Sequence, residues 1–334
     1  MRDPIERAAD ESRDLQEVAT WEPRSTLDVI AVHSHRIGLA GLRAAIITLA
    51  FLILVAQVVL GGIAAVVDPI IGGFVILSIV PALAIAGYIW HLDVTEREPL
   101  SLLLITFLLG VLFAGFAGVI NTIGILPFLW IGTLAEATVP AVAEVIAFAG
   151  LVGFFFLIVG PVEETVKLLA VRLYAYRSAR FDAVINGTVY GAAAGLGFAT
   201  IENALYIVQG LESGVSGVEA LRPAGDVAAA RALAGPGHVL YSALAGYYLG
   251  LAKFNPSQRG PLVVKGILIA AVLHALYNTL VGPVPELLAM AIQPVSPEIG
   301  LVLFITGYLG AVGYLLYRKI RRYSKTYHAL GLTR

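Results

Sequence analysis

Stretches of about 20 mostly apolar residues recur from residue 44 almost to the end of the chain. A transmembrane helix needs about 20 such residues to cross the hydrocarbon layer of a bilayer. Of the 334 residues, 58% are hydrophobic and 13% are charged, whereas soluble domains carry roughly 25% charged residues. A soluble core cannot bury so many long apolar segments. We therefore predict an all-α fold, a polytopic transmembrane helix bundle.

The number of spans depends on two segments. The stretch 122–138 contains Pro127 and Trp130, so it fits a re-entrant segment, an interfacial segment or another span. The stretch 139–180 is either two spans or one long helix broken at Gly160-Pro161, because proline removes a backbone donor and kinks a helix. We therefore predict about eight spans, within a range of eight to ten. The predicted spans are 44–67, 70–90, 100–121, 139–160, 161–180, 181–208, 232–252, 262–282 and 299–317.

The distribution of Lys and Arg predicts the orientation, because cytoplasmic loops of membrane proteins are enriched in these residues. With both termini in the cytoplasm, 19 of the 22 Lys and Arg residues fall on that side, Arg222 and Arg231 fall on the other, and Lys167 lies within a span. We therefore predict cytoplasmic N- and C-termini, with external loops at 209–231 and 283–298. The predicted parts are a cytoplasmic N-terminal arm at 1–43, a transmembrane bundle at 44–317 and a basic cytoplasmic tail at 318–334.

Composition excludes several kinds of chemistry. The chain has no cysteine, so disulfides and thiolate catalysis are excluded, and a metal site would have to use His, Asp or Glu. The formal net charge is −1, and no basic cluster is interleaved with aromatic residues, which argues against nucleic-acid binding. The predicted surroundings are the lipid bilayer and proteins embedded in it.

Ionisable side chains occur inside the later predicted spans, where each costs roughly 2.5–3.5 kcal/mol on translocon scales. Glu163 and Lys167, like His274 and Asn278, are four residues apart and lie on one helix face. At about 1.5 Å per residue from the nearest cytoplasmic basic residue, the set lies roughly 14–33 Å above the inner boundary. Polar groups on four helices at overlapping depths predict one shared cavity. The set comprises Glu163, Glu164, Lys167, Glu202, His238, His274 and Asn278.

Two histidines and a glutamate are a common ligand set for catalytic zinc, with the fourth position left for water. Glu202, His238 and His274 fit this description and are the predicted ligands of one zinc or other divalent metal ion. Glu163 is then a candidate base that takes a proton from the water. Asn278, one turn from His274, is a candidate donor to a developing oxyanion.

The same residues support a metal-free mechanism, in which Glu163 and a histidine activate water while His274 and Asn278 hold the oxyanion. Each residue alone also has a simpler interpretation. Glu163 and Lys167 form a neutralised pair, Glu164 orients Glu163 or pairs with Lys167, and a single intramembrane histidine is often a helix–helix hydrogen-bond partner. Because the groups occur together on four helices, we favour a functional site over these separate explanations.

A ridge of small residues lies on the helix that carries Glu202. Gly187, Gly191 and Gly195 follow the small-xxx-small pattern, which lets helix backbones approach closely. We expect this packing to bring Glu202 close to its neighbours.

Five short motifs follow one another along the chain. They are Asp93-x-x-Glu96-x-Glu98-Pro99, Glu163-Glu164-x-x-Lys167, Phe198-x-x-x-Glu202-Asn203, His238 and His274-x-x-x-Asn278. Their order and spacing, over roughly residues 90–281, resemble the PrsW family of intramembrane proteases. That family is distantly related to the CAAX prenyl endopeptidases and to bacteriocin-processing membrane proteases.

The resemblance implies an intramembrane endopeptidase that hydrolyses a peptide bond by Glu-activated water. Glu163 would be the catalytic glutamate, Glu164 its partner, and Glu202, His238 and His274 the rest of the site. The family is described as metalloprotease-like, whereas its prenyl-protein relatives have been argued to be metal-independent glutamate proteases, so both mechanisms stay open. The substrate would be a membrane-embedded protein, for example a single-pass regulator such as an anti-sigma factor. The protein itself would be a multi-pass component of the cytoplasmic membrane.

Two other functions fit part of the pattern. Buried Glu, His and Asn side chains also serve as ion sites and proton relays in transporters. The early spans have no matching polar set, so the inverted repeat of many transporters is not evident. A catalytically inactive membrane scaffold is the second alternative, although such a protein would have no use for so many costly polar groups.

Overall fold

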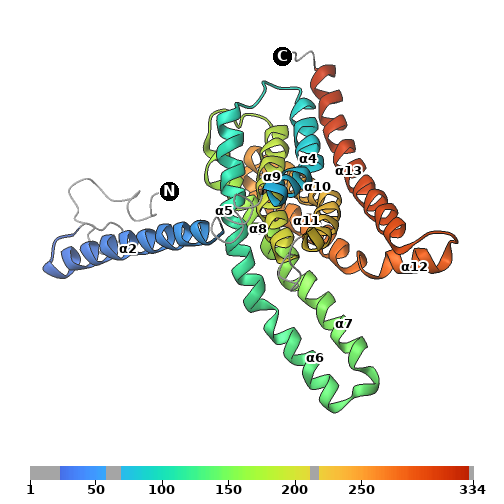
Figure 1. Ribbon diagram of the computed structural model, residues 1–334. Helices are drawn as coiled ribbons and strands as arrows, with labels where there is room; N and C mark the ends of the chain where they lie inside the picture. Colours follow the sequence, from blue (N-terminus) through green and yellow to red (C-terminus); the bar gives the residue numbers. More distant parts are fainter. Residues whose placement is uncertain (1–22, 58–68, 211–217, 331–334) are drawn as a thin grey trace. The chain divides into compact units, whose positions relative to one another are not determined.

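The computed structural model describes residues 23–57, 69–210 and 218–330, and regular secondary structure in these ranges is helical (Figure 1). The chain divides into two compact units, Met1–Leu52 and Ile53–Arg334. Most of helix α2 (Thr26–Gln57) belongs to the first unit. It begins after a capping pair, because Ser25 Oγ accepts from the amide of Asp28 and a carboxylate oxygen of Asp28 accepts from the amide of Ser25, at 3.1 and 2.8 Å. The predicted span 44–67 begins in α2, and its residues 58–67 lie outside the described ranges.

The second unit is a helix bundle. Short 3₁₀ turns or connections separate its helices, and a π-helical turn at Phe155–Val159 joins α7 to α8. Its helices are α4 (Pro69–His91), α5 (Leu100–Gly124), α6 (Leu126–Thr138), α7 (Ala143–Phe154), α8 (Gly160–Leu173), α9 (Val184–Gln209), α10 (Val218–Phe254), α11 (Arg259–Leu280), α12 (Pro283–Ala291) and α13 (Pro297–Ala329).

Six helical stretches in the described residues are long and apolar enough to cross a membrane, so the protein is a multi-pass membrane protein. Helix α10, which contains the predicted span 232–252, is not among them. The number of spans and the cytoplasmic placement of the termini stay predictions. The six stretches are Pro69–His91, Leu100–Thr138, Pro140–Arg177, Val184–Gln209, Pro256–Leu280 and Pro297–Ala329.

The ambiguous stretch 122–138 is helical. Helix α6 continues from α5, and the two together form one apolar stretch of 39 residues. Helices α6 and α7 pack against each other as a hairpin that stands out from the rest of the bundle (Figure 1). The return stretch is also continuous as far as Arg177, with the π-helical turn directly before Gly160-Pro161, where a break was expected.

Two predicted external loops are wrong in part. In the loop predicted at 209–231, residues 218–231 belong to α10, because the segment is rich in alanine and other good helix formers. The loop predicted at 283–298 contains α12, whose first turn begins with Pro283, a position that tolerates proline because its amide has no partner there. Helix α13 likewise runs through most of the predicted tail, ending at Ala329.

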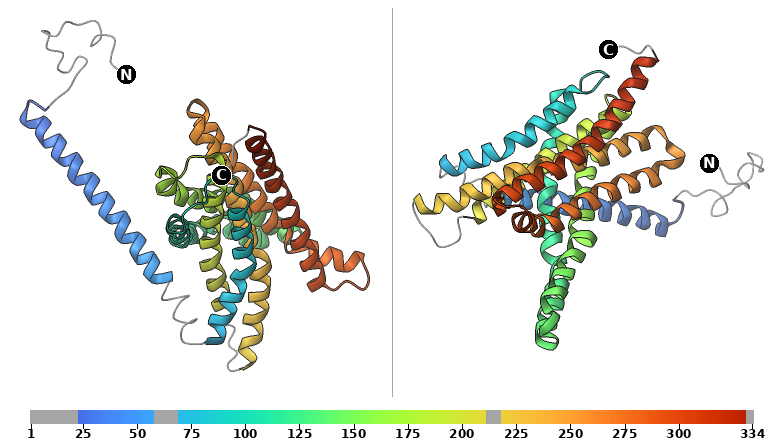
Figure 2. Two further views of the ribbon diagram at one scale, coloured as in Figure 1. Left: turned by 90° about the horizontal axis from the view of Figure 1, so that it is seen from above. Right: turned by 90° about the vertical axis from the view of Figure 1, so that its right-hand side faces the viewer.

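Helices α9 and α10 form the centre of the bundle, and α4 runs beside them (Figure 2). The glycine ridge explains their approach, since a Cβ at Gly187, Gly191 or Gly195 would overlap the backbone of α10. The predicted close packing is therefore confirmed. Most of the α9 surface is buried inside the protein, so polar residues on this helix face other helices.

The connection between α4 and α5 is fixed to the first turns of α9 by buried polar groups. Asp93 accepts from the Thr95 amide and hydroxyl at 2.9 and 2.7 Å, and the Asn186 side chain donates to the Thr95 hydroxyl at 3.3 Å. The hydroxyl of Tyr190 donates to one carboxylate oxygen of Glu98. The other oxygen of Glu98 is buried without a hydrogen-bond partner in the described residues. Burial raises the pKa of Glu98 from 4.5 to about 7, against the opposing effect of Tyr190.

This raised pKa predicts a pH-dependent stability. The folded protein binds the Glu98 proton more tightly than the unfolded chain. The contribution of this proton to the free energy of unfolding is therefore fully present below about pH 4.5. It is lost as the pH rises through about 7, and amounts to on the order of 3 kcal/mol. We expect the melting temperature in detergent to fall between pH 5 and pH 8. The fall should be smaller in Glu98→Gln, whose neutral amide still accepts from Tyr190.

Glu96→Gln is the matched control, because Glu96 lies in the same connection but is exposed and pairs with Arg180 at 2.7 Å. Its pH profile should follow the wild type. If the melting temperature fell equally with pH in the wild type and in Glu98→Gln, the result would contradict a proton held at Glu98.

Candidate active site

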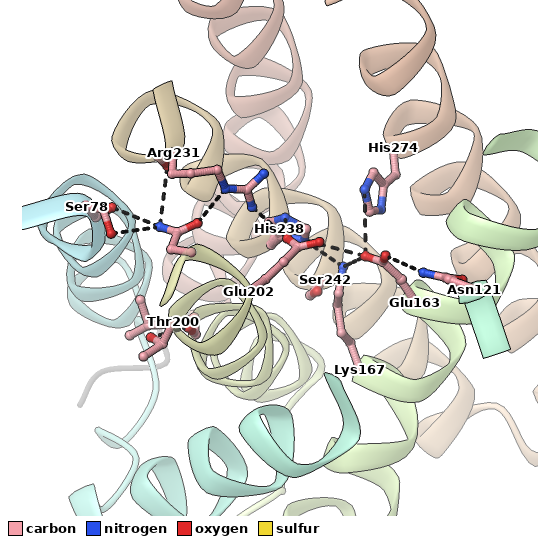
Figure 3. A network of polar contacts seen from close by, with 12 residues as sticks. Ser78, Asn121, Glu163, Lys167, Thr200, Glu202, Arg231, His238, Ser242 and His274 are labelled. Atoms are coloured by element: carbon pink, nitrogen blue, oxygen red, sulfur yellow. Dashed lines mark hydrogen bonds and ion pairs between the residues drawn. The ribbon is translucent and has the colours of Figure 1, made fainter. Parts of the chain in front are cut away.

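Four neighbouring helices of the bundle direct polar side chains to one place (Figure 3). The shared residues are Glu163, Glu164 and Lys167 on α8, Glu202 on α9, His238 on α10 and His274 on α11. Glu164 and Lys167 are fully buried, and Glu163, His238 and His274 are each at most 5% exposed. Small residues allow this approach, since a Cβ at Gly160 would overlap the backbone of α11 and one at Gly195 would overlap the backbone of His238.

Glu164 organises one half of the site. One carboxylate oxygen, Oε1, accepts from the Lys167 ammonium at 2.7 Å and from His274 Nδ1 at 2.9 Å. The other oxygen accepts from the Ser242 hydroxyl at 3.4 Å. Lys167 therefore pairs more closely with Glu164 than with Glu163, which is 3.6 Å away. As an ionised carboxylate, Glu164 accepts a hydrogen bond from each of these three side chains.

Glu202 organises the other half. Its Oε2 atom accepts from His238 Nε2 at 2.7 Å and from Arg231 Nη2 at 2.7 Å. Arg231 also donates from Nε to Asn203 Oδ1 at 2.9 Å. The Glu202–Arg231 pair is the more accessible part of the network, with side chains 20% and 17% exposed.

These hydrogen bonds assign the tautomers of the two histidines. An ionised carboxylate only accepts, so His274 carries its proton on Nδ1 toward Glu164 and His238 carries its proton on Nε2 toward Glu202. The remaining ring nitrogens, His274 Nε2 and His238 Nδ1, then carry lone pairs, and the one on His238 Nδ1 accepts from the Lys167 ammonium at 3.0 Å. The two nitrogens lie 3.8 and 3.9 Å from the same oxygen, Glu163 Oε2. Two nitrogen lone pairs and a carboxylate oxygen therefore converge.

One carboxylate oxygen of Glu163 is buried without a hydrogen-bond donor in the described residues, although the Lys167 ammonium lies 3.6 Å from it. Asn121 Nδ2 on α5 donates to Oε1 at 3.0 Å. Within the described part of the chain, the buried Oε2 atom accepts no hydrogen bond. A buried carboxylate oxygen without a donor is costly unless a proton, water or cation satisfies it.

The convergent atoms fit a metal ion. Glu163, His238 and His274 each offer one ligand atom, and these atoms lie within 4.8 Å of one another. Three such ligands with one open position are the usual donor set of catalytic zinc, and carboxylates behind the two histidines, here Glu164 and Glu202, are the usual supporting groups. The Lys167 ammonium lies 3.0 Å from His238 Nδ1 and would have to release that atom to a metal.

The structure brings most of the predicted site residues together, but their contacts differ from the predicted ones. The sequence grouped Glu202 with the two histidines as ligands, whereas the converging atoms belong to Glu163, and Glu202 Oε2 is occupied by His238 and Arg231. The side chain of Asn278 is partly exposed and makes no hydrogen bond within the described residues.

Sequence reasoning missed two members of the network, Asn121 and Arg231. Asn121 is a lone amide in a long apolar stretch, and a polar residue in such a stretch is itself a sign of a functional site. Arg231 was counted only as a loop charge, although it precedes His238 by two helical turns and so lies on nearly the same face.

A bundle of apolar helices that buries such a glutamate–histidine site defines a multi-pass membrane enzyme with hydrolytic chemistry. A family model described as "PrsW family intramembrane metalloprotease" matches residues 98–311, which include the whole site. The chain therefore belongs to the PrsW family and is an intramembrane protease. The resemblance predicted from the five motifs is confirmed.

Individual relatives agree. Protease PrsW of Geobacillus kaustophilus is 33% identical over 204 residues, which is 61% of this chain and 77% of that protein. Protease PrsW of Bacillus subtilis is 30% identical over 61% of this chain and 82% of that protein. Protease PrsW of Shouchella clausii is 26% identical over 66% of this chain and 88% of that protein. No solved structure gives a significant match.

Proposed function

We propose that Glu163 is the base that activates water for hydrolysis of a peptide bond in a membrane-embedded substrate. The observation that carries this proposal is the geometry of Glu163 Oε2. It is buried, accepts no hydrogen bond in the described residues, and faces the lone-pair nitrogens of His238 and His274 at 3.9 and 3.8 Å. A water at this point would donate to Glu163, which is the arrangement that general-base catalysis needs.

The reaction balances with these groups. The water gives one proton to Glu163, and its oxygen attacks the carbonyl carbon of the substrate. The carbon–nitrogen bond then breaks, and the leaving amine takes the proton from Glu163. The hydrogen bond from Asn121 to the other oxygen holds the carboxylate in one orientation. Asn278 has no hydrogen-bond partner in the described residues, so its amide is available for the proposed oxyanion role.

Charge balance supports a metal in this mechanism. Among the residues that the structure describes, three carboxylates, those of Glu163, Glu164 and Glu202, face two permanent cations, Lys167 and Arg231. A buried excess of negative charge favours binding of a divalent cation. His238 Nδ1, His274 Nε2 and Glu163 would hold it, and when bound it supplies Lewis-acid polarisation of water and carbonyl.

One observation favours the metal-free alternative. The Lys167 ammonium already lies 3.0 Å from His238 Nδ1 and 3.6 Å from Glu163 Oε2, close to the place that a metal would take. In that mechanism the lysine supplies the positive charge beside the developing oxyanion. Both mechanisms require Glu163 as the proton acceptor.

The proposed substrate is a single-pass membrane protein, such as an anti-sigma factor, cut near the external end of its transmembrane segment. Two features support this choice: the predicted orientation places the site in the middle to outer half of the cytoplasmic membrane, and the exposed part of the network is the Glu202–Arg231 pair. Residues Arg222 and Arg231 are the basic residues predicted on that outer side.

Reporter cleavage tests the proposal. The purified protein would be reconstituted in proteoliposomes with a panel of single-pass reporters, anti-sigma factors included, and the products mapped by mass spectrometry. We expect one cleavage within or a few residues from the external end of the apolar segment. Cleavage only in cytoplasmic domains would overturn the proposed depth. Ion or proton flux through the same vesicles without any cleavage would favour the transporter alternative.

A further inference from the structure

Arg231 is fixed on three sides although it lies at the edge of the site. Its Nη2 donates to Glu202 Oε2 at 2.7 Å, and its Nε donates to Asn203 Oδ1 at 2.9 Å. The guanidinium also lies over the ring of Tyr206, 4.6 Å from the centroid. A side chain with so many partners cannot turn freely, so the position of Arg231 is set by α9 as well as by its own helix.

Asn203 connects this arginine to α4. The Asn203 side chain is fully buried, and its Nδ2 donates to both the backbone and side-chain oxygens of Ser78 at 3.2 Å each. Gly235 leaves the space for that amide, since a Cβ there would lie 3.3 Å from Nδ2. A continuous polar chain therefore runs from Ser78 through Asn203 and Arg231 to Glu202.

The chain of contacts ends on the histidine that faces Glu163. Arg231 and His238 donate to the same atom, Glu202 Oε2, each at 2.7 Å. Because the arginine fixes that oxygen, the proton of His238 stays on Nε2, and Nδ1 accepts from the Lys167 ammonium at 3.0 Å and lies 3.9 Å from Glu163 Oε2. Without the arginine, the carboxylate would lose its strongest fixed partner and could rotate away from the imidazole.

We propose that Arg231 is a positioning residue that holds Glu202 so that His238 presents Nδ1 to Lys167 and Glu163. This inference rests on the proposed function for its kinetic consequence, but not for its structural one. Arg231 itself touches none of the converging atoms, so it acts through Glu202. Supporting carboxylates and their partners usually contribute about 10–100-fold to metal affinity or activity.

The experiment compares Arg231→Gln and Arg231→Lys with the wild type. The first readout is the histidine nitrogen spectrum of labelled protein in proteoliposomes by solid-state NMR, with the His238 signals assigned from His238→Gln. We expect a single His238 tautomer protonated on Nε2 in the wild type and a mixture in Arg231→Gln. Arg231→Lys should restore the tautomer in part, because lysine supplies the charge but not the two-pronged contact with Glu202 and Asn203.

The second readout is reporter cleavage. We expect kcat to fall about 10–100-fold in Arg231→Gln with KM within about twofold of the wild type. Arg222→Gln is the matched control, since Arg222 is an exposed arginine on the same helix, and it should match the wild type in both readouts. A raised KM with unchanged kcat would overturn positioning in favour of substrate contact, and an unchanged His238 tautomer in Arg231→Gln would overturn it directly.

The two proposals fail in different ways. If the wild type cleaves no reporter while the His238 tautomer still responds to Arg231→Gln, the proposed function is wrong and the positioning role stands. If the wild type cleaves but the tautomer does not respond, the positioning role is wrong. Should Arg231→Gln fold poorly, the milder Arg231→Lys carries the comparison.

Discussion

Replacing Glu163 by glutamine is expected to lower the rate of reporter cleavage by about 10²–10⁴-fold, which is the usual contribution of a general base. Glutamine keeps the size of the side chain, and its carbonyl oxygen still accepts the hydrogen bond that Asn121 donates at 3.0 Å. The amide cannot take a proton from water, however. The loss should therefore appear in kcat, and KM should change little because the substrate contacts are kept. The measurement is the initial rate of cleavage in proteoliposomes at matched protein amounts.

Glu136→Gln provides the matched control, because Glu136 is an exposed glutamate on α6, and its rate should equal that of the wild type. The melting temperature of Glu163→Gln should not fall, since the substitution removes a buried negative charge that has no full partner. A cleavage rate within threefold of the wild type would show that Glu163 is not the base.

Metal analysis should find about one divalent cation per chain in the purified protein, held by the convergent donors of the site. The double variant His238→Ala/His274→Ala should lose that metal, because it removes both nitrogen lone pairs that face Glu163. Cleavage should fall below detection in the same variant. The measurement is elemental mass spectrometry on detergent-purified protein after gel filtration, with zinc, manganese, cobalt and iron quantified together.

A second double variant separates this site from adventitious binding. His91→Ala/His328→Ala removes two exposed histidines outside the network and should keep the metal and the activity. Metal-free protein that still cleaves its reporter would favour the alternative in which Lys167 supplies the positive charge. In the metal-free mechanism, Lys167→Met should abolish cleavage. In the metal-dependent mechanism, the same variant should still contain the metal.

The helical bundle was predictable because the bilayer imposes a simple rule on length and polarity. Apolar stretches of about 20 residues predicted most of the helices that the structure contains, and polar residues four positions apart predicted the faces that meet. Glu163, Glu164, Glu202, His238 and His274 were grouped because they lie at overlapping depths on four helices, and the structure places them in one network. The family followed from the same residues in sequence order.

The pairing of individual atoms was not predictable, because it depends on the rotation of each helix about its axis. The sequence predicted Glu202 as a metal ligand and Glu163 as the base, without their hydrogen-bond partners. The structure distinguishes them through neighbours distant in sequence: Arg231 pairs with Glu202, and Asn121 donates to Glu163. The start of α10 was missed for another reason. Hydropathy detects spans, and a charged, alanine-rich helical extension does not register as one.

The length of the α5–α6 stretch has a consequence for the surrounding lipid. Its 39 residues extend about 58 Å at 1.5 Å per residue, nearly twice the roughly 30 Å thickness of the hydrocarbon layer. Such hydrophobic mismatch is relieved by steep tilt or by local thickening of the bilayer, at a cost of fractions of a kcal/mol per Å. The acyl-chain length of the host lipid therefore affects the conformational free energy of the α5–α6 stretch. This stretch contains Asn121, whose side chain donates to Glu163.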